Sequence, residues 1–134
     1  MTVPDVALRN WLDQLTPTFI QTLKARLYKN NLTIAVGTVL ADFTEADFSG
    51  YASAALAGFT AAAIVGHSAN TDGNQIIWTV SASPSTTNNI YGVYITDAGN
   101  TKLYGAVAAA SAPIAMAVGG ASVVWTPSVN VITQ

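Results

Sequence analysis

Charged side chains are scarce in this sequence, and the scarcity is concentrated in its second part. Asp, Glu, Lys and Arg make up 9% of the 134 residues, whereas an ordinary globular chain contains about one quarter. Nine of the twelve charges lie in the first 50 residues, and only Asp72, Asp97 and Lys102 follow. A surface with so little charge is poorly protected against association. The sequence therefore predicts a body made for contact with copies of itself or with a partner.

Cysteine is absent, which excludes disulfides, Cys-ligated zinc, iron–sulfur clusters and thiol catalysis. Basic residues are also few: Arg9, Lys24, Arg26 and Lys29 are the only ones before Lys102. Binding to phosphate backbones needs clustered Lys and Arg, so no nucleic-acid partner is expected. We interpret the basic residues of segment 24–29 as local partners of three nearby acids, Asp42, Glu45 and Asp47.

Neither a signal peptide nor a membrane span is expected. The first five residues lack a basic start followed by an apolar stretch. Residues 103–121 carry no charge and are nearly long enough to cross a bilayer. They are mostly Ala, Gly and Ser with Pro113 in the middle, and small residues partition weakly into lipid. With room for one core, we expect a helix or arm over residues 1–20 and a β-sandwich domain over residues 21–134.

One helix is expected, over residues 4–15. Its apolar residues follow helical spacing: Val6, Leu8, Trp11, Leu12 and Leu15. Residues 16–18, Thr-Pro-Thr, are expected to end it, and the helix either packs on the domain or reaches a neighbour.

Alternating or β-branched runs separated by turn residues predict the strands. In residues 23–30 this alternation places Leu23, Ala25 and Leu27 on the buried side and Lys24, Arg26 and Tyr28 on the other. An extended piece with a turn near Gly37 follows, and the Ala-rich residues 52–66 favour a strand bent at Gly58. The further strands are expected at residues 75–81, 90–96, 101–108, 114–118, 122–125 and 129–133. Turns are expected at residues 70–74 and 97–100, a loop at 83–89, and a capped turn where Thr44 precedes Asp47. This pattern indicates a mainly β protein, an antiparallel sandwich or barrel with a short N-terminal helix.

The sequence contains no recognisable catalytic motif. His67 is the single histidine, and in a Gly-His-Ser context we interpret it as a surface residue. No Gly-x-Ser-x-Gly elbow, phosphate-binding loop or dinucleotide motif is present. Oxygen ligands for calcium are offered by Asp42, Glu45 and Asp47. The spacing of glycine and acidic residues that is typical of a calcium-binding loop is missing, so we favour solvated acids and a cap. The sequence thus predicts no enzyme, no catalytic, cofactor-binding or metal-ligating residues and no cofactor.

Eight tryptophan and tyrosine side chains allow two interpretations. They either line a carbohydrate-binding face or pack in the core and at interfaces, which is the commoner use on strands. Trp78 and Tyr91 sit among apolar neighbours, which favours the core. The full set is Trp11, Trp78, Trp125, Tyr28, Tyr51, Tyr91, Tyr94 and Tyr104.

Four motifs resemble those of a family of small tailed-bacteriophage proteins. They are Leu-Tyr-x-Asn-Asn at residues 27–31, Leu-Ala-Asp-Phe-Thr-Glu-Ala-Asp-Phe-x-Gly-Tyr at 40–51, Gly-x-Tyr-Ile-Thr-Asp at 92–97, and Trp-Thr-Pro at 125–127. The resemblance spans most of residues 20–130. Residues 106–121 depart from it, because relatives carry charged or aromatic residues where this chain has Ala and Gly.

The resemblance implies a virion structural protein. On this basis we expect a capsid decoration (cement) protein on the outer capsid surface, bound to the major capsid protein and assembled as a trimer or dimer. Apolar burial and strand-edge pairing would supply the affinity. The alternatives are a tail or head–tail junction component, or a carbohydrate- or receptor-binding module.

Overall fold

The computed structural model describes residues 5–66, 68–82 and 86–132. The chain is mainly β, with 38% strand and 14% helix, and its sheets are antiparallel. Within the described residues the strands form four small sheets, which fits the sandwich-like alternative. The fold class expected from the sequence, a mainly β protein with a short N-terminal helix, is confirmed.

The chain divides into two compact units. Unit 1 comprises Met1–Thr22, Leu56–Ile76 and Trp125–Gln134, and unit 2 comprises Leu23–Ala55 and Ile77–Val124. This division differs from the expected boundary near residue 20. The reason is that the helix shares a unit with two later segments of the chain.

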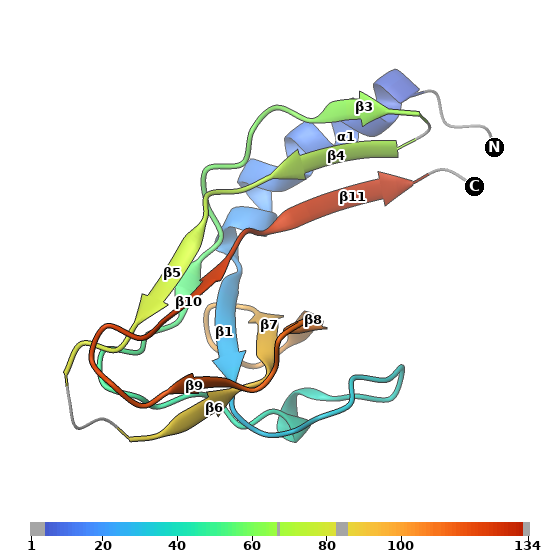
Figure 1. The fold of residues 1–134 in the computed structure, drawn as a ribbon. Helices are drawn as coiled ribbons and strands as arrows, with labels where there is room; N and C mark the ends of the chain where they lie inside the picture. Colours follow the sequence, from blue (N-terminus) through green and yellow to red (C-terminus); the bar gives the residue numbers. More distant parts are fainter. Residues whose placement is uncertain (1–4, 67, 83–85, 133–134) are drawn as a thin grey trace. The chain divides into compact units, whose positions relative to one another are not determined.

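Unit 1 is a three-stranded sheet with a helix alongside. The strand order is β11-β4-β3, and helix α1 contacts β4 and β3, as Figure 1 shows. The final strand expected near the C-terminus therefore exists, and it pairs antiparallel with β4. The elements are α1 (Asp5–Thr18), η1 (Ile20–Thr22), β3 (Ala63–Val65), β4 (Ser68–Asp72) and β11 (Ser128–Ile132).

Helix α1 continues through the Thr-Pro-Thr segment that was expected to end it. The hydroxyls of Thr16 and Thr18 donate to the carbonyls of Leu12 and Gln14. Pro17 has no N–H to donate to the Asp13 carbonyl. The two threonine hydroxyls bond to the carbonyls on either side of it, as Ser and Thr commonly do within helices. The predicted end was therefore wrong by three residues.

The buried face of α1 is narrower than the spacing predicted. Leu12 is fully buried and Thr16 nearly so, one turn apart, whereas Val6 and Leu15 are exposed. Thr16 can lie in the core because its hydroxyl is hydrogen-bonded within the helix. The side chains of Leu8 and Trp11 lie outside the described part of the structure.

Residues 70–72 belong to a strand, so the turn predicted for residues 70–74 was wrong in its first half. Asn70 pairs with both β3 and β11, and Thr71 and Asp72 pair with β11. Thr71 is buried, and its hydroxyl donates to the carbonyl of Thr60. Pairing with β11, together with the hydrogen bonds that Thr71 and Asp72 form with Thr60, overrides the turn preference of these polar residues. Of the predicted turn, only Gly73 and Asn74 remain in the connection.

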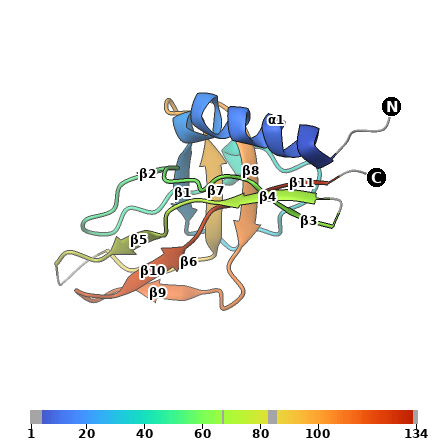
Figure 2. The same cartoon turned by 90° about the horizontal axis from the view of Figure 1, so that it is seen from above.

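Unit 2 is built around a four-stranded antiparallel sheet in the order β2-β1-β7-β8. In Figure 2, β1, β7 and β8 lie side by side. A second pair, β6 with β9, also belongs to this unit. The elements are β1 (Lys24–Tyr28), η2 (Leu40–Asp42), β2 (Ala54–Ala55), β6 (Asn88–Ile90), β7 (Gly92–Thr96), β8 (Leu103–Ala108) and β9 (Ile114–Met116).

Strand β1 confirms the expected half-buried strand, with one correction. Ala25 and Leu27 are fully buried as predicted, but Tyr28, assigned to the open side, is fully buried too. The segment after β1 folds back over this side, and the Phe43 ring packs edge-on against Tyr28 and stacks on Tyr94. The aromatic cover explains why alternation alone missed the burial.

The β7–β8 hairpin was predicted correctly. Its register runs from Gly92 opposite Ala108 to Thr96 opposite Leu103. Asp97 organises the loop: its carboxylate accepts from the amides of Thr101 and Lys102 and from the Thr101 hydroxyl, at 2.7–2.8 Å. Asn100 occupies the left-handed region, with φ 55°. The loop thus follows the turn chemistry that its sequence suggested.

Two predicted loops and turns are placed differently. Thr44 does not cap a turn: the short helical turn is η2, and the Asp42 carboxylate accepts from the Val39 amide. Residues 88–89, expected in a loop, start β6, where the Asn88 side chain is buried. The Ala-rich segment 52–66 forms two short strands, β2 and β3, with Gly58 between them at φ 66°.

Strands β5 (Ile76–Thr79) and β10 (Ser122–Trp125) form a two-stranded sheet. Val80 faces both Gly120 and Ala121: its carbonyl accepts from the Gly120 amide, and its own amide donates to the Ala121 carbonyl, each at 2.9 Å. Gly120 has φ 88°. This is a bulge with glycine in the left-handed position, which explains why a glycine occurs here.

Candidate assembly surface

The acids proposed as a possible calcium site do not converge on a common point. Asp42 caps η2, while Glu45 and Asp47 are held by donors from other segments. Within residues 5–66, 68–82 and 86–132, no three His, Cys, Asp or Glu side chains gather as metal ligands would. These oxygens are therefore engaged by protein donors and serve the fold.

Glu45 is the acceptor in a partly buried network. Arg26 donates from Nη1 to its two oxygens at 2.8 and 3.1 Å, and the Tyr51 hydroxyl donates to Oε1 at 2.8 Å. The Tyr51 oxygen in turn accepts from the Leu27 amide, and Arg26 Nε donates to Thr96. Burial, reinforced by the Glu45 charge, raises the pKa of Tyr51 and raises the pKa of Tyr94 to about 12. The network joins β1, β7 and the 43–51 segment.

Asp47 is held in a more exposed arrangement. Lys29 Nζ lies 2.7 Å from its Oδ2, and the Asn88 amide donates to its Oδ1 at 2.8 Å. The Asp47 backbone amide in turn donates a hydrogen bond to Asn88 Oδ1. The Lys29 hydrogen bond, followed by the Asn88 bond, lowers the pKa of Asp47. The expected local pairing of bases with acids is thus confirmed for Arg26 and Lys29.

Of the two other candidate positions, His67 lies outside the described residues. The oxygen-rich segment 70–74 is mostly the strand β4, and the backbone amides of Gly73 and Asn74 donate to carbonyls of Pro127 and Ala57. The segment therefore serves the sheet of unit 1.

Most described aromatic side chains are used inside the protein. Tyr28, Tyr94 and Trp78 are buried, and Trp78 donates to the carbonyl of Ala52. Tyr104, 45% exposed, is the one described Trp or Tyr classed as exposed. This distribution favours the core interpretation over a carbohydrate-binding platform.

Large apolar side chains, in contrast, are exposed over much of unit 2. On the β5–β10 pair, Trp78 and Val123 are buried, whereas Ile77 and Val124 are 58% and 51% exposed. Counting back from the Val80–Ala121 bond places Ile77 opposite Val124. The described exposed set in unit 2 is Val36, Val39, Ile77, Tyr104, Val107, Val118 and Val124.

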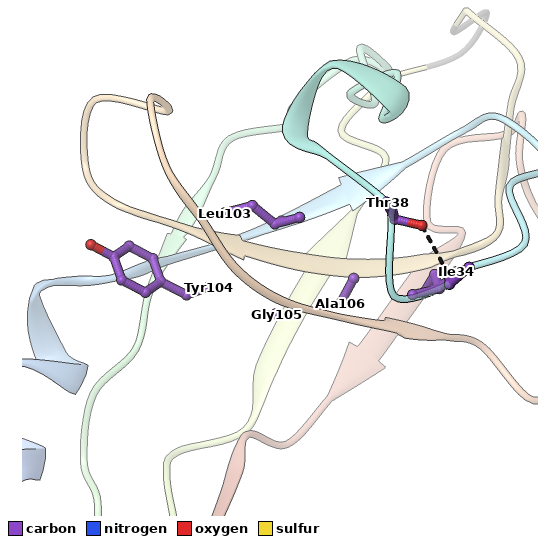
Figure 3. A pocket seen from close by; sticks show the side chains of 7 residues that line it. Ile34, Thr38, Leu103, Tyr104, Gly105 and Ala106 are labelled. Atoms are coloured by element: carbon purple, nitrogen blue, oxygen red, sulfur yellow. Dashed lines mark hydrogen bonds between the residues drawn. The ribbon is translucent and has the colours of Figure 1, made fainter.

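A shallow pocket of about 220 Å³ lies beside strand β8. Residues 103–106 form one wall and Ile34, Ala35 and Thr38 the other, as Figure 3 shows. The Thr38 hydroxyl accepts from the Ala35 amide and fixes this turn. The walls carry no charged side chain, so the pocket suits an apolar group.

Sequence reasoning located part of this surface. The shortage of charge after residue 50 indicated apolar surface in this part of the chain, and Val107 and Val118 are exposed. Sequence reasoning missed Ile77 and Val124, because a two-residue period does not tell which side of a two-stranded sheet is covered. It also missed the pocket, since the turn at residues 34–38 meets β8 only in the folded chain.

No protein-family model matches the chain, and neither the curated proteins nor the solved structures yield a significant match. Among the described residues, no helix has the length and apolar character needed to cross a membrane.

Proposed function

We propose that the chain is a structural protein of a bacteriophage virion, and more specifically a capsid decoration protein. Its partner would be the major capsid protein, on the outer capsid surface, and copies of the chain would associate with one another. The sequence resemblance over residues 40–51 and 92–97 supports the virion assignment. The observation that carries the proposal is the set of exposed apolar side chains in residues 77–124 of unit 2, a stretch with only two charged residues, because a shell-bound protein needs surface that avoids water.

Ile77 and Val124 are the best candidates for contact with the capsid. They are exposed apolar neighbours on the β5–β10 pair, and no charged residue occurs between Asp72 and Asp97. Covering each half-exposed side chain contributes about 1 kcal/mol at about 25 cal/mol per Å². Repetition over a symmetric shell would strengthen such weak contacts if oligomers bind through several copies.

The experiment mixes purified protein with phage heads that lack it and measures co-sedimentation. The proposal expects saturable binding with a stoichiometry set by the shell lattice, and loss of binding when Ile77 and Val124 are both replaced by Lys. The matched control is Asn89→Lys, an exposed polar position on β6, which should still bind. Failure of the unaltered protein to bind heads refutes the proposal, and binding of only a few copies per particle assigns the protein to the tail or head–tail junction.

A further inference from the structure

Strand β8 is an edge of the four-stranded sheet. Edge strands normally carry charged residues, proline or a covering segment that blocks pairing with another chain. Residues 103–108 contain neither a charged residue nor proline. The turn at residues 34–38 lines a pocket with residues 103–106, and residues 107 and 108 are not part of that lining. A register shift near Leu103 interrupts the strand at one end, which leaves residues 105–108 as its regular part.

The backbone groups of Ala106 and Ala108 point to the open side of β8. The Ala109 amide donates to the Tyr91 carbonyl at 2.8 Å, and the register with β7 is one-to-one from Ala108 to Gly105. In an antiparallel ladder, every second residue bonds to a given neighbour. Because Ala109 bonds toward β7, so do Val107 and Gly105, and the amides and carbonyls of Ala106 and Ala108 face outward.

We propose that β8 pairs antiparallel with β8 of a second copy of this chain, about a twofold axis at Val107. In this register, Ala106 of each copy lies opposite the second copy's Ala108, and each such pair exchanges two backbone hydrogen bonds. The two Val107 residues face each other as a pair without ladder bonds, where side chains approach most closely. Val107 is 46% exposed in the single chain, so pairing removes apolar surface from water.

The absence of charge favours a second copy of the chain as the partner of the open β8 edge. A twofold interface places a surface patch against the same patch of the second copy, so any net charge on β8 would be repelled by the same charge on the other β8. Residues 103–121 carry no charge. Lys102 would lie opposite Ala112 of the second copy by the same count, and the two lysines do not meet. Small side chains at Gly105, Ala106 and Ala108 also allow two backbones to approach.

This inference deepens the proposed structural role and rests on it, but the two can fail separately. A chain that self-associates through β8 but ignores heads refutes the proposed function alone. A monomer that still binds heads refutes the pairing alone.

The first experiment measures molar mass by sedimentation over a range of concentrations. The unaltered protein is expected to form a dimer or a larger closed assembly, and Val107→Lys to raise the dissociation constant by roughly tenfold or more because like charges meet at the axis. The matched control is Val65→Lys, an exposed valine on strand β3 of unit 1, which should self-associate normally. Circular dichroism shows whether each variant is folded. A monomeric unaltered protein, or equal weakening by both lysines, overturns the proposal.

The second experiment uses the absence of cysteine from the chain. Val107→Cys places two thiols at the axis, within reach of a disulfide, and mild oxidation should give mostly covalent dimer. Val65→Cys should give little at the same concentration. Equal cross-linking of the two variants, or none at position 107, contradicts the proposed register.

Discussion

Arg26 and Glu45 form a charge pair between β1 and the segment that follows η2, with Nη1 2.8 Å from Oε1. Their side chains are 12% and 30% exposed, so water screens the pair only in part. Glu45 also bridges to Tyr51. The pair therefore holds residues 43–51 against the central sheet of unit 2.

Replacing Glu45 with Ala should destabilise the protein by about 1–3 kcal/mol, since Arg26 and the Tyr51 hydroxyl lose a charged acceptor in a partly buried place. Urea unfolding would measure the change. The control is Asp47→Asn, which removes the charge of the more exposed Lys29 pair and should cost less than about 1 kcal/mol. Equal losses for the two variants would show that burial does not set the cost.

Gly92→Ala should destabilise the protein by about 2–3 kcal/mol or more, because an added Cβ overpacks a close contact. That atom would lie 2.1 Å from the Val107 carbonyl oxygen and 2.7 Å from the Tyr28 ring. Gly105→Ala is the matched control on the paired strand: nothing lies within 4 Å of its Cβ position. Its stability should stay within about 1 kcal/mol of the unaltered protein. The thermal midpoints of the two variants provide the comparison.

Tyr28→Phe should be neutral or stabilising by about 1 kcal/mol, whereas Tyr51→Phe should destabilise by about 1–2 kcal/mol. The Tyr28 hydroxyl is buried and has no hydrogen-bond partner among the described residues. The Tyr51 oxygen accepts from the Leu27 amide, and its loss leaves that amide unpaired. Chemical unfolding of both variants tests the contrast, and a larger loss for Tyr28→Phe would reverse our assignment.

Asp97 should stabilise the hairpin loop above pH 4 and lose this effect as the pH falls toward 2. Bonds from the Thr101 hydroxyl and from the Lys102 and Thr101 amides lower the pKa of Asp97 from 3.8 to about 2. A carboxyl whose pKa is lower when folded binds protons more readily when unfolded, so acid favours unfolding in this window. The stability difference between the unaltered protein and Asp97→Ala should shrink from pH 4 to pH 2. A difference that stays constant over that range would exclude this role.

Local sequence signals predicted those parts of the fold that depend on local chemistry. The Asp97 loop and the glycines at 119–120 were located because their turns need particular side chains or backbone angles. Residues 70–72 were misplaced because the buried Thr71 hydroxyl is satisfied by Thr60, a partner eleven residues away. Tyr28 was wrongly predicted to lie on the open side of β1, because the Phe43 ring that packs against it belongs to another segment of the chain.

The candidate surface was predictable in kind but not in place. The shortage of charge after residue 50 indicated surface made for association. Which apolar residues are left uncovered depends on which strands lie at an edge, and β8 is an edge because β7 is its one neighbour in the sheet order. The order of the strands in the sheet cannot be read from a local sequence pattern.

The chain passes between its two units four times, after residues 22, 55, 76 and 124. Neither unit can therefore be cut out as one continuous fragment. Unit 1 receives β11 last as these residues are synthesised, so its central strand β4 lacks one neighbour until residues 128–132 have been made. During that interval the nascent protein presents a bare sheet edge that a chaperone or another copy can occupy.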